Sequence, residues 1–184
     1  MEPTEAIYGR RATRAFTQSP VAKPVLEQLV AAIQAPSATN EQSWDFTVIR
    51  NAALLDRISD ASKAYALAAM APGALPPHLG ERLEDPEFHI FYHAPALIVI
   101  AARSGAWAVE DATLVAENLM LAAHGRGLGT CWIGLAQRWL ETGDGKRLIE
   151  VPDDFQPVAP IIVGYAATPM PSAPRKPAHL RWID

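Results

Sequence analysis

The chain has 184 residues, with 16 Lys and Arg against 20 Asp and Glu, a net charge of −4 at pH 7 and 49% hydrophobic residues. Such a composition is typical of a globular protein and argues against nucleic-acid binding, which depends on neutralising phosphates with Lys and Arg. The length suits one domain over residues 1–184. The apolar run 94–102 is far too short to span a bilayer, so we expect no membrane association.

The cysteine count and the first residues indicate a compartment. Cys131 is the only cysteine of the chain, so no intrachain disulfide can form. Residues 1–5 lack the basic start and the apolar run of a secretory signal. We therefore predict a cytoplasmic protein.

The N-terminal segment 6–14 carries Arg10, Arg11 and Arg14, followed by Phe16. If this segment is helical, Arg10 and Arg14 lie four residues apart on one face. Two like charges in this arrangement repel unless an anion or nearby carboxylates compensate them. The segment therefore predicts either an anion site or a solvent-exposed basic face.

A helix is expected from Pro24, because proline suits the first helical position. The polar segment 35–44 that follows is rich in side chains that bond to backbone or ligand; otherwise it is an ordinary loop anchored by Trp44. A short strand over 46–49 and a helix over 52–64 come next. The helix after Pro24 has one apolar face, formed by Val25, Leu26, Leu29, Val30 and Ile33.

Residues 65–93 mix aromatic residues with prolines, glycines and charges, and we expect them to form an irregular lid. Residues 96–102, ALIVIAA, predict a central strand. Residues 112–123 are apolar on nearly every face at helical spacing, which predicts a buried helix. Asp111 is its expected N-cap, and Gly125 its expected left-handed C-terminal residue.

A glycine-rich turn then leads to a strand over 130–135. Gly134 within this strand predicts a bulge or a ligand packed against bare backbone. An interrupted helix over 138–149 is followed by a strand over 158–165, in which Pro160 should lie near the start or at a sheet edge. Because helices and strands alternate too irregularly for a doubly wound parallel sheet, we predict an α+β fold ending in an extended arm over 167–184.

Spacing argues against three kinds of site. The glycines at 125, 127 and 129 follow a predicted helix, whereas a dinucleotide-binding fingerprint opens one. The five histidines lack metal-ligand spacing, so no metal is expected. Cys131 lies in an apolar run, which favours a buried structural thiol over a nucleophile.

Four segments, in order along the chain, resemble motifs of the nitroreductase family of flavoproteins. RRATRAF at 10–16 is similar to the family's Arg-Arg-Ser-x-Arg-x-Phe opening, and PSATNEQSW at 36–44 to its Pro-Ser-x-x-Asn-x-Gln-Pro-Trp loop. GLGTCWIG at 127–134 resembles the family's central turn, and PRKP at 174–177 its C-terminal arm. Ala12 stands where the family often has serine, and Ser43 replaces the usual proline.

The resemblance implies a nitroreductase-like α+β fold, with a central mixed or antiparallel sheet flanked by helices. It also implies an intertwined homodimer that binds FMN at the subunit interface. Arg10, Arg11 and Arg14 would contact the phosphate and the pyrimidine edge, and Arg175 would reach the phosphate. Ala12 would serve through its backbone.

The remaining residues implied by the resemblance come from two other segments. The loop of the other subunit would approach the flavin with Gln42 supporting it, and backbone near Gly134 would face the flavin N5. The residues concerned are Pro36, Ser37, Ala38, Asn40 and Gln42 of the loop, and Ile133 and Gly134 after the glycine-rich turn.

The implied activity is that of an FMN-dependent oxidoreductase. It would pass a hydride from NADH or NADPH through flavin N5 to a nitroaromatic, quinone or similar small acceptor, with ping-pong kinetics. Because the cofactor supplies the chemistry, no catalytic acid or base is expected. The alternative is a flavin-binding or flavin-sensing module without turnover, and a third hypothesis is a cofactor-free dimeric interaction protein.

Overall fold

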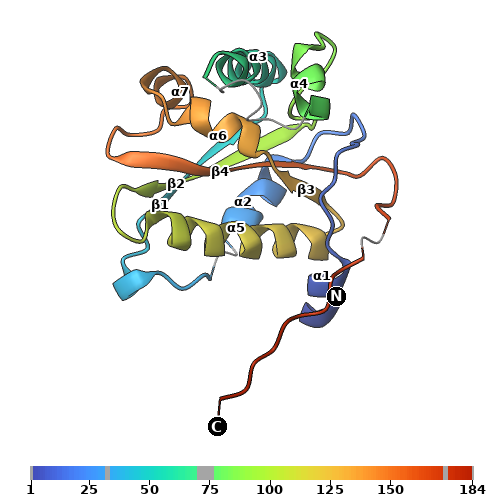
Figure 1. Cartoon of the computed structure of the whole chain (residues 1–184), viewed down its shortest axis with the longest axis vertical. Helices are drawn as coiled ribbons and strands as arrows, with labels where there is room; N and C mark the ends of the chain where they lie inside the picture. The colour runs from blue at the N-terminus through green and yellow to red at the C-terminus, as the bar shows by residue number, and fades with distance from the viewer. Residues whose placement is uncertain (1, 32–33, 70–76, 172–173, 184) are drawn as a thin grey trace.

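The fold is built on an antiparallel sheet. The computed structural model describes residues 2–31, 34–69, 77–171 and 174–183. Within these ranges the sheet has four strands in the order β1-β2-β4-β3. The strands are β1 (Trp44–Ile49), β2 (Ala96–Arg103), β3 (Gly129–Trp132) and β4 (Phe155–Gly164). All neighbouring strands pair antiparallel (Figure 1).

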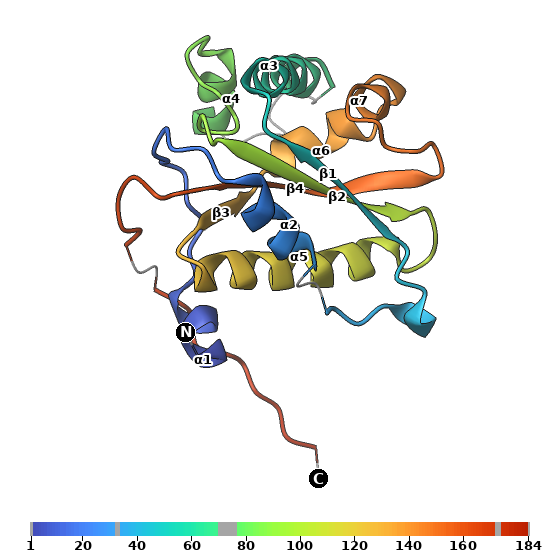
Figure 2. The ribbon, with the colours of Figure 1, turned by 180° about the vertical axis from the view of Figure 1, so that it is seen from behind.

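Helices cover both faces of this sheet (Figures 1 and 2). One face carries α5 (Ala108–Gly125) and α2 (Lys23–Ala31), and the other α3 (Ala52–Ala69), α4 (Pro77–Glu84), α6 (Gly134–Leu140) and α7 (Gly143–Leu148). Successive side chains of β2 therefore enter two different cores, because side chains alternate across a strand. Ile98 packs with α5, whereas Leu97 and Val99 pack on the side of α3 and α6. The predicted α+β fold is confirmed.

The predicted buried helix is the core of one layer. Val115, Ala116 and Leu119 of α5 are fully buried. The predicted boundaries are wrong at both ends, however. The helix begins at Ala108 with Trp107 as N-cap, so Asp111 lies inside the first turn, and the left-handed residue after the helix is Gly127 (φ 75°) rather than Gly125.

The predicted strands over 46–49, 96–102 and 158–165 are confirmed as parts of β1, β2 and β4. The prediction for Pro160 is wrong, because β4 lies between β2 and β3 and Pro160 is well inside it. The carbonyl of Pro160 accepts from the N–H of Ile133 (2.8 Å), so its ring nitrogen also faces the side of β3. Since β3 has already ended at Trp132, no ladder bond is lost there.

Other predicted boundaries also change. The strand expected over 130–135 stops at Trp132, and Gly134 begins α6 instead of forming a bulge. The helix expected over 138–149 is divided between α6 and α7, with Gly143 as the first residue of α7. The N-terminal helix α1 (Pro3–Gly9) ends before the arginines, so Arg10 and Arg14 do not share a helical face. Ile33, predicted on the face of α2, lies outside the described residues.

The segment expected to be an irregular lid, 65–93, is helical over 65–69 and 77–84 and irregular over 85–93, among the residues that are described. Tyr65–Ala69 continues α3, residues 70–76 lie outside the described ranges, and 77–84 form α4. Helix α3 continues five residues beyond the predicted end at Ala64. The prediction ended the helix too early because the mixed composition after Ala64 obscured its pattern. None of the described helices is long and apolar enough to cross a membrane.

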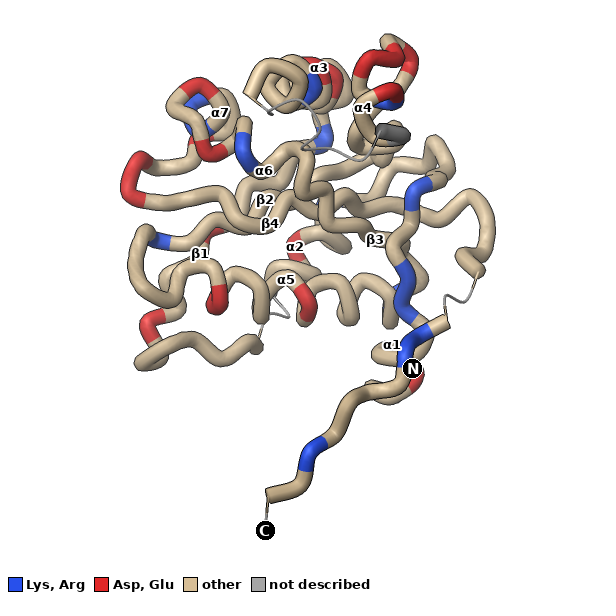
Figure 3. The backbone as a smooth tube through the Cα atoms, in the orientation of Figure 1, with Lys and Arg blue, Asp and Glu red and all other residues tan. Residues whose placement is uncertain are grey.

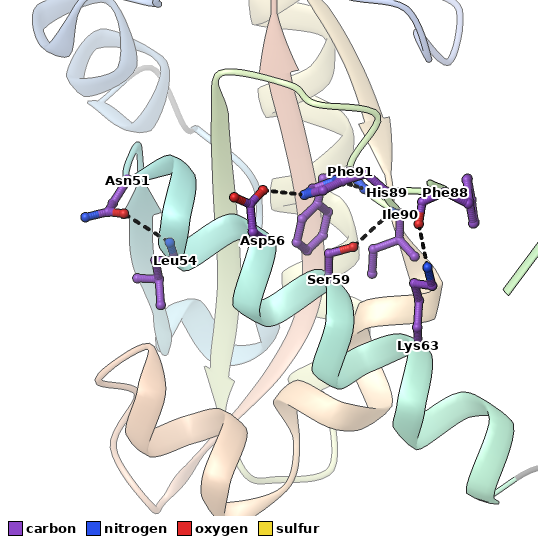
Figure 4. A network of polar contacts seen from close by, with 9 residues as sticks. All are labelled: Asn51, Leu54, Asp56, Ser59, Lys63, Phe88, His89, Ile90 and Phe91. Atoms are coloured by element: carbon purple, nitrogen blue, oxygen red, sulfur yellow. Dashed lines mark hydrogen bonds and ion pairs between the residues drawn. The ribbon is translucent and has the colours of Figure 1, made fainter. Parts of the chain in front are cut away.

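Polar contacts join the chain before β2 to α3 (Figure 4). The Lys63 ammonium, almost fully buried, donates to the carbonyls of Asp85 (2.7 Å) and Phe88 (2.9 Å). The Ser59 hydroxyl accepts from the N–H of Ile90, and His89 Nε2 lies 3.2 Å from the Asp56 carboxylate. These contacts hold residues 85–91 on α3.

The protonation of His89 fits this network. Its Nδ1 accepts a hydrogen bond from the N–H of Phe91 (3.1 Å), which requires that Nδ1 carry no proton. Burial, together with the neighbouring His93, lowers the pKa of His89, although Asp56 acts in the opposite direction. The neutral ring, with its proton on Nε2 toward Asp56, is therefore the form that the structure holds.

Replacing Lys63 with Met should lower the free energy of unfolding by about 2–3 kcal/mol, because two carbonyls lose a charged donor. Denaturant titration of the purified protein measures this loss. The matched control is Arg57→Met, which removes an exposed guanidinium from the same helix and should cost less than about 0.5 kcal/mol. Equal stability of Lys63→Met and wild type would contradict the role given to Lys63.

Candidate functional site

The basic segment 10–16 lies extended along the outer edge of β3. Ala12 forms a parallel bridge with Thr130, and the N–H of Thr13 donates to the carbonyl of Thr130 (2.9 Å). Gly129 makes this approach possible, since a Cβ there would lie 2.5 Å from the Thr13 hydroxyl oxygen. Figure 3 shows the Lys and Arg residues that follow one another along this part of the chain, beside β3. The sheet edge therefore carries a row of cations.

The arginines of this segment are held in different ways. Arg10 Nε pairs with the Glu117 carboxylate of α5 at 3.2 Å, and the Arg11 guanidinium donates to the carbonyls of Tyr8 (2.7 Å) and Arg10 (2.8 Å). Arg14 is exposed and lies near the Cys131 thiol of β3. The guanidiniums thus extend from the end of α1 to the middle of β3.

A cavity of 340 Å³ opens beside these arginines. Arg10, Arg11, Thr13 and Thr130 line it on one side. Among the described residues that line it there is no carboxylate. The Thr130 hydroxyl is buried and has no hydrogen-bond partner within the described part of the chain. Cations and an unused hydroxyl fit a phosphate attached to a polyol. The other lining residues are Gly9, His124, Gly127, Leu128, Gly129, Ala166, Pro169 and Met170.

The far end of β3 leads directly to Ile133 and Gly134. Ile133 is the N-cap of α6, and Gly134 is its exposed first residue. No atom lies within 4 Å of the position that a Gly134 Cβ would occupy. The first N–H groups of a helix have no intrahelical acceptor. The main chain here can therefore approach a planar ligand closely.

Cys131 lies in β3, between the cavity-lining Thr130 and the exposed Gly134. Burial raises the pKa of its thiol, and the nearby guanidiniums of Arg14 and Arg10 oppose that shift without cancelling it. The thiol donates a weak hydrogen bond to the carbonyl of Trp132 (3.6 Å). A buried, protonated thiol supports the structural role predicted for Cys131.

The loop 36–42 is fixed by its own polar contacts and contains the 3₁₀ turn η1 (Ala38–Asn40). The Ser37 hydroxyl accepts from the N–H of Gln42 (2.9 Å), and the Gln42 amide donates to the Asn40 side chain (3.0 Å). Asn40 and Gln42 both have positive φ angles, 58° and 50°. Gln42 therefore bonds within the loop through both its main chain and its side chain.

Asp111 anchors this loop to the core. Its buried carboxylate accepts from the N–H of Ala38 (3.0 Å) across 73 positions of sequence. The sequence singled out Asp111 only as a helix cap and missed this contact. The available signal was a carboxylate directly before the apolar face that begins at Ala112. Glu117, the partner of Arg10, and His124, which lines the cavity, were missed entirely.

Within one chain, the predicted site residues fall into separate groups. Arg10, Arg11 and Arg14 lie with the end of β3, whereas loop 36–42 lies at the opposite end of α5 (Figure 1). Asp111 anchors the loop and His124 lines the cavity beside the arginines, and the 13 helical steps from one residue to the other span about 20 Å. Arg175 is exposed and does not line the cavity, although Pro169 and Met170 of the same arm do.

The sequence model of the Nitroreductase family matches residues 7–165. The chain belongs to this family. Among its relatives, a Methanothermobacter thermautotrophicus protein is 29% identical over 168 residues, which are 91% of this chain and 78% of that protein. The nitrobenzene nitroreductase of Ectopseudomonas oleovorans is 30% identical over an alignment of 209 residues, covering 91% of this chain and 88% of that enzyme.

Solved structures show the same fold. A Bacteroides fragilis nitroreductase with bound FMN superposes with a TM-score of 0.87 at 24% identity, and each chain is covered completely. A Desulfitobacterium hafniense nitroreductase with bound FMN gives 0.85 at 23% identity, again over both whole chains. The nitroreductase-like fold expected from the four motifs is thereby confirmed.

The anchor of loop 36–42 can be tested without any ligand. Asp111→Ala in this nitroreductase-family protein should accelerate hydrogen exchange at the Ala38 amide at least tenfold, because a hydrogen bond to a charged group is worth ~1.5–3 kcal/mol. Asp111→Asn keeps an oxygen acceptor and should give a smaller change. Glu110→Ala, on the exposed neighbour, is the control. An unchanged rate in Asp111→Ala would show that the loop does not depend on this contact.

Proposed function

We propose that this nitroreductase-family protein is an FMN-dependent oxidoreductase that uses NADH or NADPH to reduce a nitroaromatic, quinone or similar small acceptor. The observation that carries the proposal is the short strand β3, which leads from a basic cavity at its start to the bare backbone at Gly134 just after its end. FMN bound there would supply the redox chemistry, transfer of a hydride from the nicotinamide to the acceptor through N5 in ping-pong order.

The basic cavity would hold the phosphate and the ribityl chain. Arg10 and Arg11 bring guanidiniums to it, and arginine suits bidentate contact with a phosphate. The buried hydroxyl of Thr130 is available to a ribityl hydroxyl. Ala12 has no side-chain donor for the phosphate, so its contribution is limited to the backbone that pairs with β3.

The other end of the surface would hold the isoalloxazine. The main chain of Ile133 and Gly134 would lie at N5, and Arg14 at the pyrimidine edge. The position of Arg14 beside Cys131 supports this, because Cys131 precedes Gly134 by only three residues along the same strand end. A guanidinium near N1 and the C2 carbonyl favours reduction of the ring by opposing the negative charge that develops there.

We further propose that two copies of the chain form each site. Pro36, Ser37, Ala38 and Asn40 lie at the opposite end of α5 from Arg14 in the same chain. A two-fold arrangement allows the loop of one copy to meet the arginines of the other. The homodimer thus explains how both groups of residues serve one flavin.

The C-terminal arm 167–184 supports the dimer. Its described residues leave the body beside α1 (Figures 1 and 2) and carry Leu180 and Trp182, which are 71% and 80% exposed. A groove of 510 Å³ between α2 and the edge strand β1 is lined by apolar side chains, including Leu26 and Phe46, and by three charged residues. We propose that the partner's arm covers this groove, and that Arg175 thereby reaches the phosphate.

The activity can be tested by anaerobic mixing of the FMN-loaded protein with NADH or NADPH. The flavin absorbance near 450 nm, a wavelength set by the cofactor itself, should bleach with at least one nucleotide. Addition of a nitroaromatic or a quinone should then restore it. Tight FMN binding without reduction by either nucleotide would instead favour a flavin-binding or flavin-sensing module. A protein that cannot be loaded with FMN would contradict the proposal.

Arg14→Ala should lower the flavin midpoint potential by about 20–60 mV, because the reduced, more negative ring loses a nearby positive charge. Solvent screening of the exposed guanidinium moves the expected shift toward the lower end of this range. FMN affinity should fall less than it does in Arg11→Ala, because Arg14 is assigned to the ring rather than to the phosphate. Arg147→Ala on α7 removes a guanidinium that pairs with Asp144 and should leave the potential unchanged. An unchanged potential in Arg14→Ala would reject its assignment.

A further inference from the structure

A second cavity lies between α3 and α6, next to the backbone proposed to face flavin N5. Its volume is 230 Å³. Gly134, Leu135 and Arg138 line it from α6, and Tyr65, Ala66 and Ala69 from α3. Ala69 lies four residues after Tyr65 and three after Ala66, the spacings of one helical face. An aromatic ring, small apolar side chains and one cation thus surround a space adjacent to Gly134.

The cation of this cavity has no carboxylate partner in the described part of the chain. This cation is the guanidinium of Arg138, which is exposed. Other arginines do have such partners: Arg10 pairs with Glu117, and Arg147 with Asp144. Glu141, three residues after Arg138 at the end of α6, accepts a hydrogen bond from the Gln137 side-chain amide (3.1 Å) and does not pair with Arg138.

This combination suits a particular kind of ligand. A planar ring fits against Tyr65 and the small side chains, as aromatic rings prefer offset or edge contacts with one another. A guanidinium without a carboxylate partner attracts an anionic group and can bind it bidentately. A neutral acceptor would gain the ring contacts alone.

We propose that Arg138 determines acceptor specificity, so that the protein prefers aromatic acceptors that carry a carboxylate. This inference rests on the proposed function and deepens it by naming the substrate class. Arg138 acts on binding and takes no part in the redox step. Tyr65 provides the ring contact on the other wall of the cavity.

Titration calorimetry of the FMN-loaded protein with 4-nitrobenzoate and 4-nitrotoluene tests this inference. The two ligands differ in charge but little in shape. Wild type should bind the carboxylate at least tenfold more tightly, the factor expected for one charge-assisted contact. Arg138→Gln should abolish the difference and leave 4-nitrotoluene within twofold of wild type. Arg138→Lys should keep part of the preference, because the charge remains.

A matched control is Arg57→Gln, which removes an exposed arginine of α3 outside the cavity. It should leave both affinities unchanged. Turnover gives a second readout: Arg138→Gln should raise KM for 4-nitrobenzoate and leave kcat unchanged, the pattern of a residue that contributes to binding alone.

The outcomes separate this inference from the proposed function. Equal weakening of both ligands in Arg138→Gln, or an unchanged preference, overturns the role of Arg138. Slower flavin reduction by the nicotinamide with the carboxylate preference intact also overturns it, because Arg138 would then serve the nucleotide. A clear carboxylate preference in a protein that neither nucleotide reduces supports the role of Arg138 and rejects the proposed activity.

Discussion

The pairing of the arginine-bearing segment with β3 is the contact on which the rest of the site depends. One backbone hydrogen bond, from Thr13 to Thr130, and the missing side chain of Gly129 bring residues 10–14 against the sheet edge. β3 is only four residues long, and α6 begins two residues after it. The same short strand therefore sets the distance between the cations and the bare main chain, which is the distance that a flavin mononucleotide would have to span.

The central helix α5 imposes the second constraint. Its buried face fixes the helix against the sheet. The residues that contact its two ends are therefore held at a constant distance from each other. Asp111 anchors the polar loop near one end, Glu117 pairs with Arg10 near the middle, and His124 lines the basic cavity at the other end. Within one chain, α5 therefore keeps the polar loop apart from the cavity at its other end. The proposed second copy of the chain would bring the two together, and would account for the loop and the C-terminal arm at once.

Local patterns in the sequence predicted the buried elements well. The apolar run of β2 and the nearly all-apolar α5 could be identified because strands and helices that are buried on every side leave few polar positions. The sequence placed Pro160 at the start or edge of its strand, but it lies inside β4. A proline is tolerated there because the neighbouring strand β3 ends before reaching it, which the local sequence of β4 does not reveal. The contact between Asp111 and Ala38 was missed for the same reason, since it links residues 73 positions apart. Arg138 belongs to no sequence motif, so the sequence did not single it out. Its cavity exists only because α3 packs on α6.

The central claim, that each flavin lies between the arginines of one copy and the loop of the other, is tested most directly by mixed dimers. Arg11→Glu places a repelling charge at the phosphate, and Ser37→Glu places bulk and charge in the loop. Each variant alone should bind no FMN, whereas purified heterodimers of the two, carrying different tags, should bind about one FMN per dimer, because one intact site is restored by symmetry. Heterodimers without FMN, or a Ser37→Glu homodimer that binds flavin as wild type does, would contradict the account.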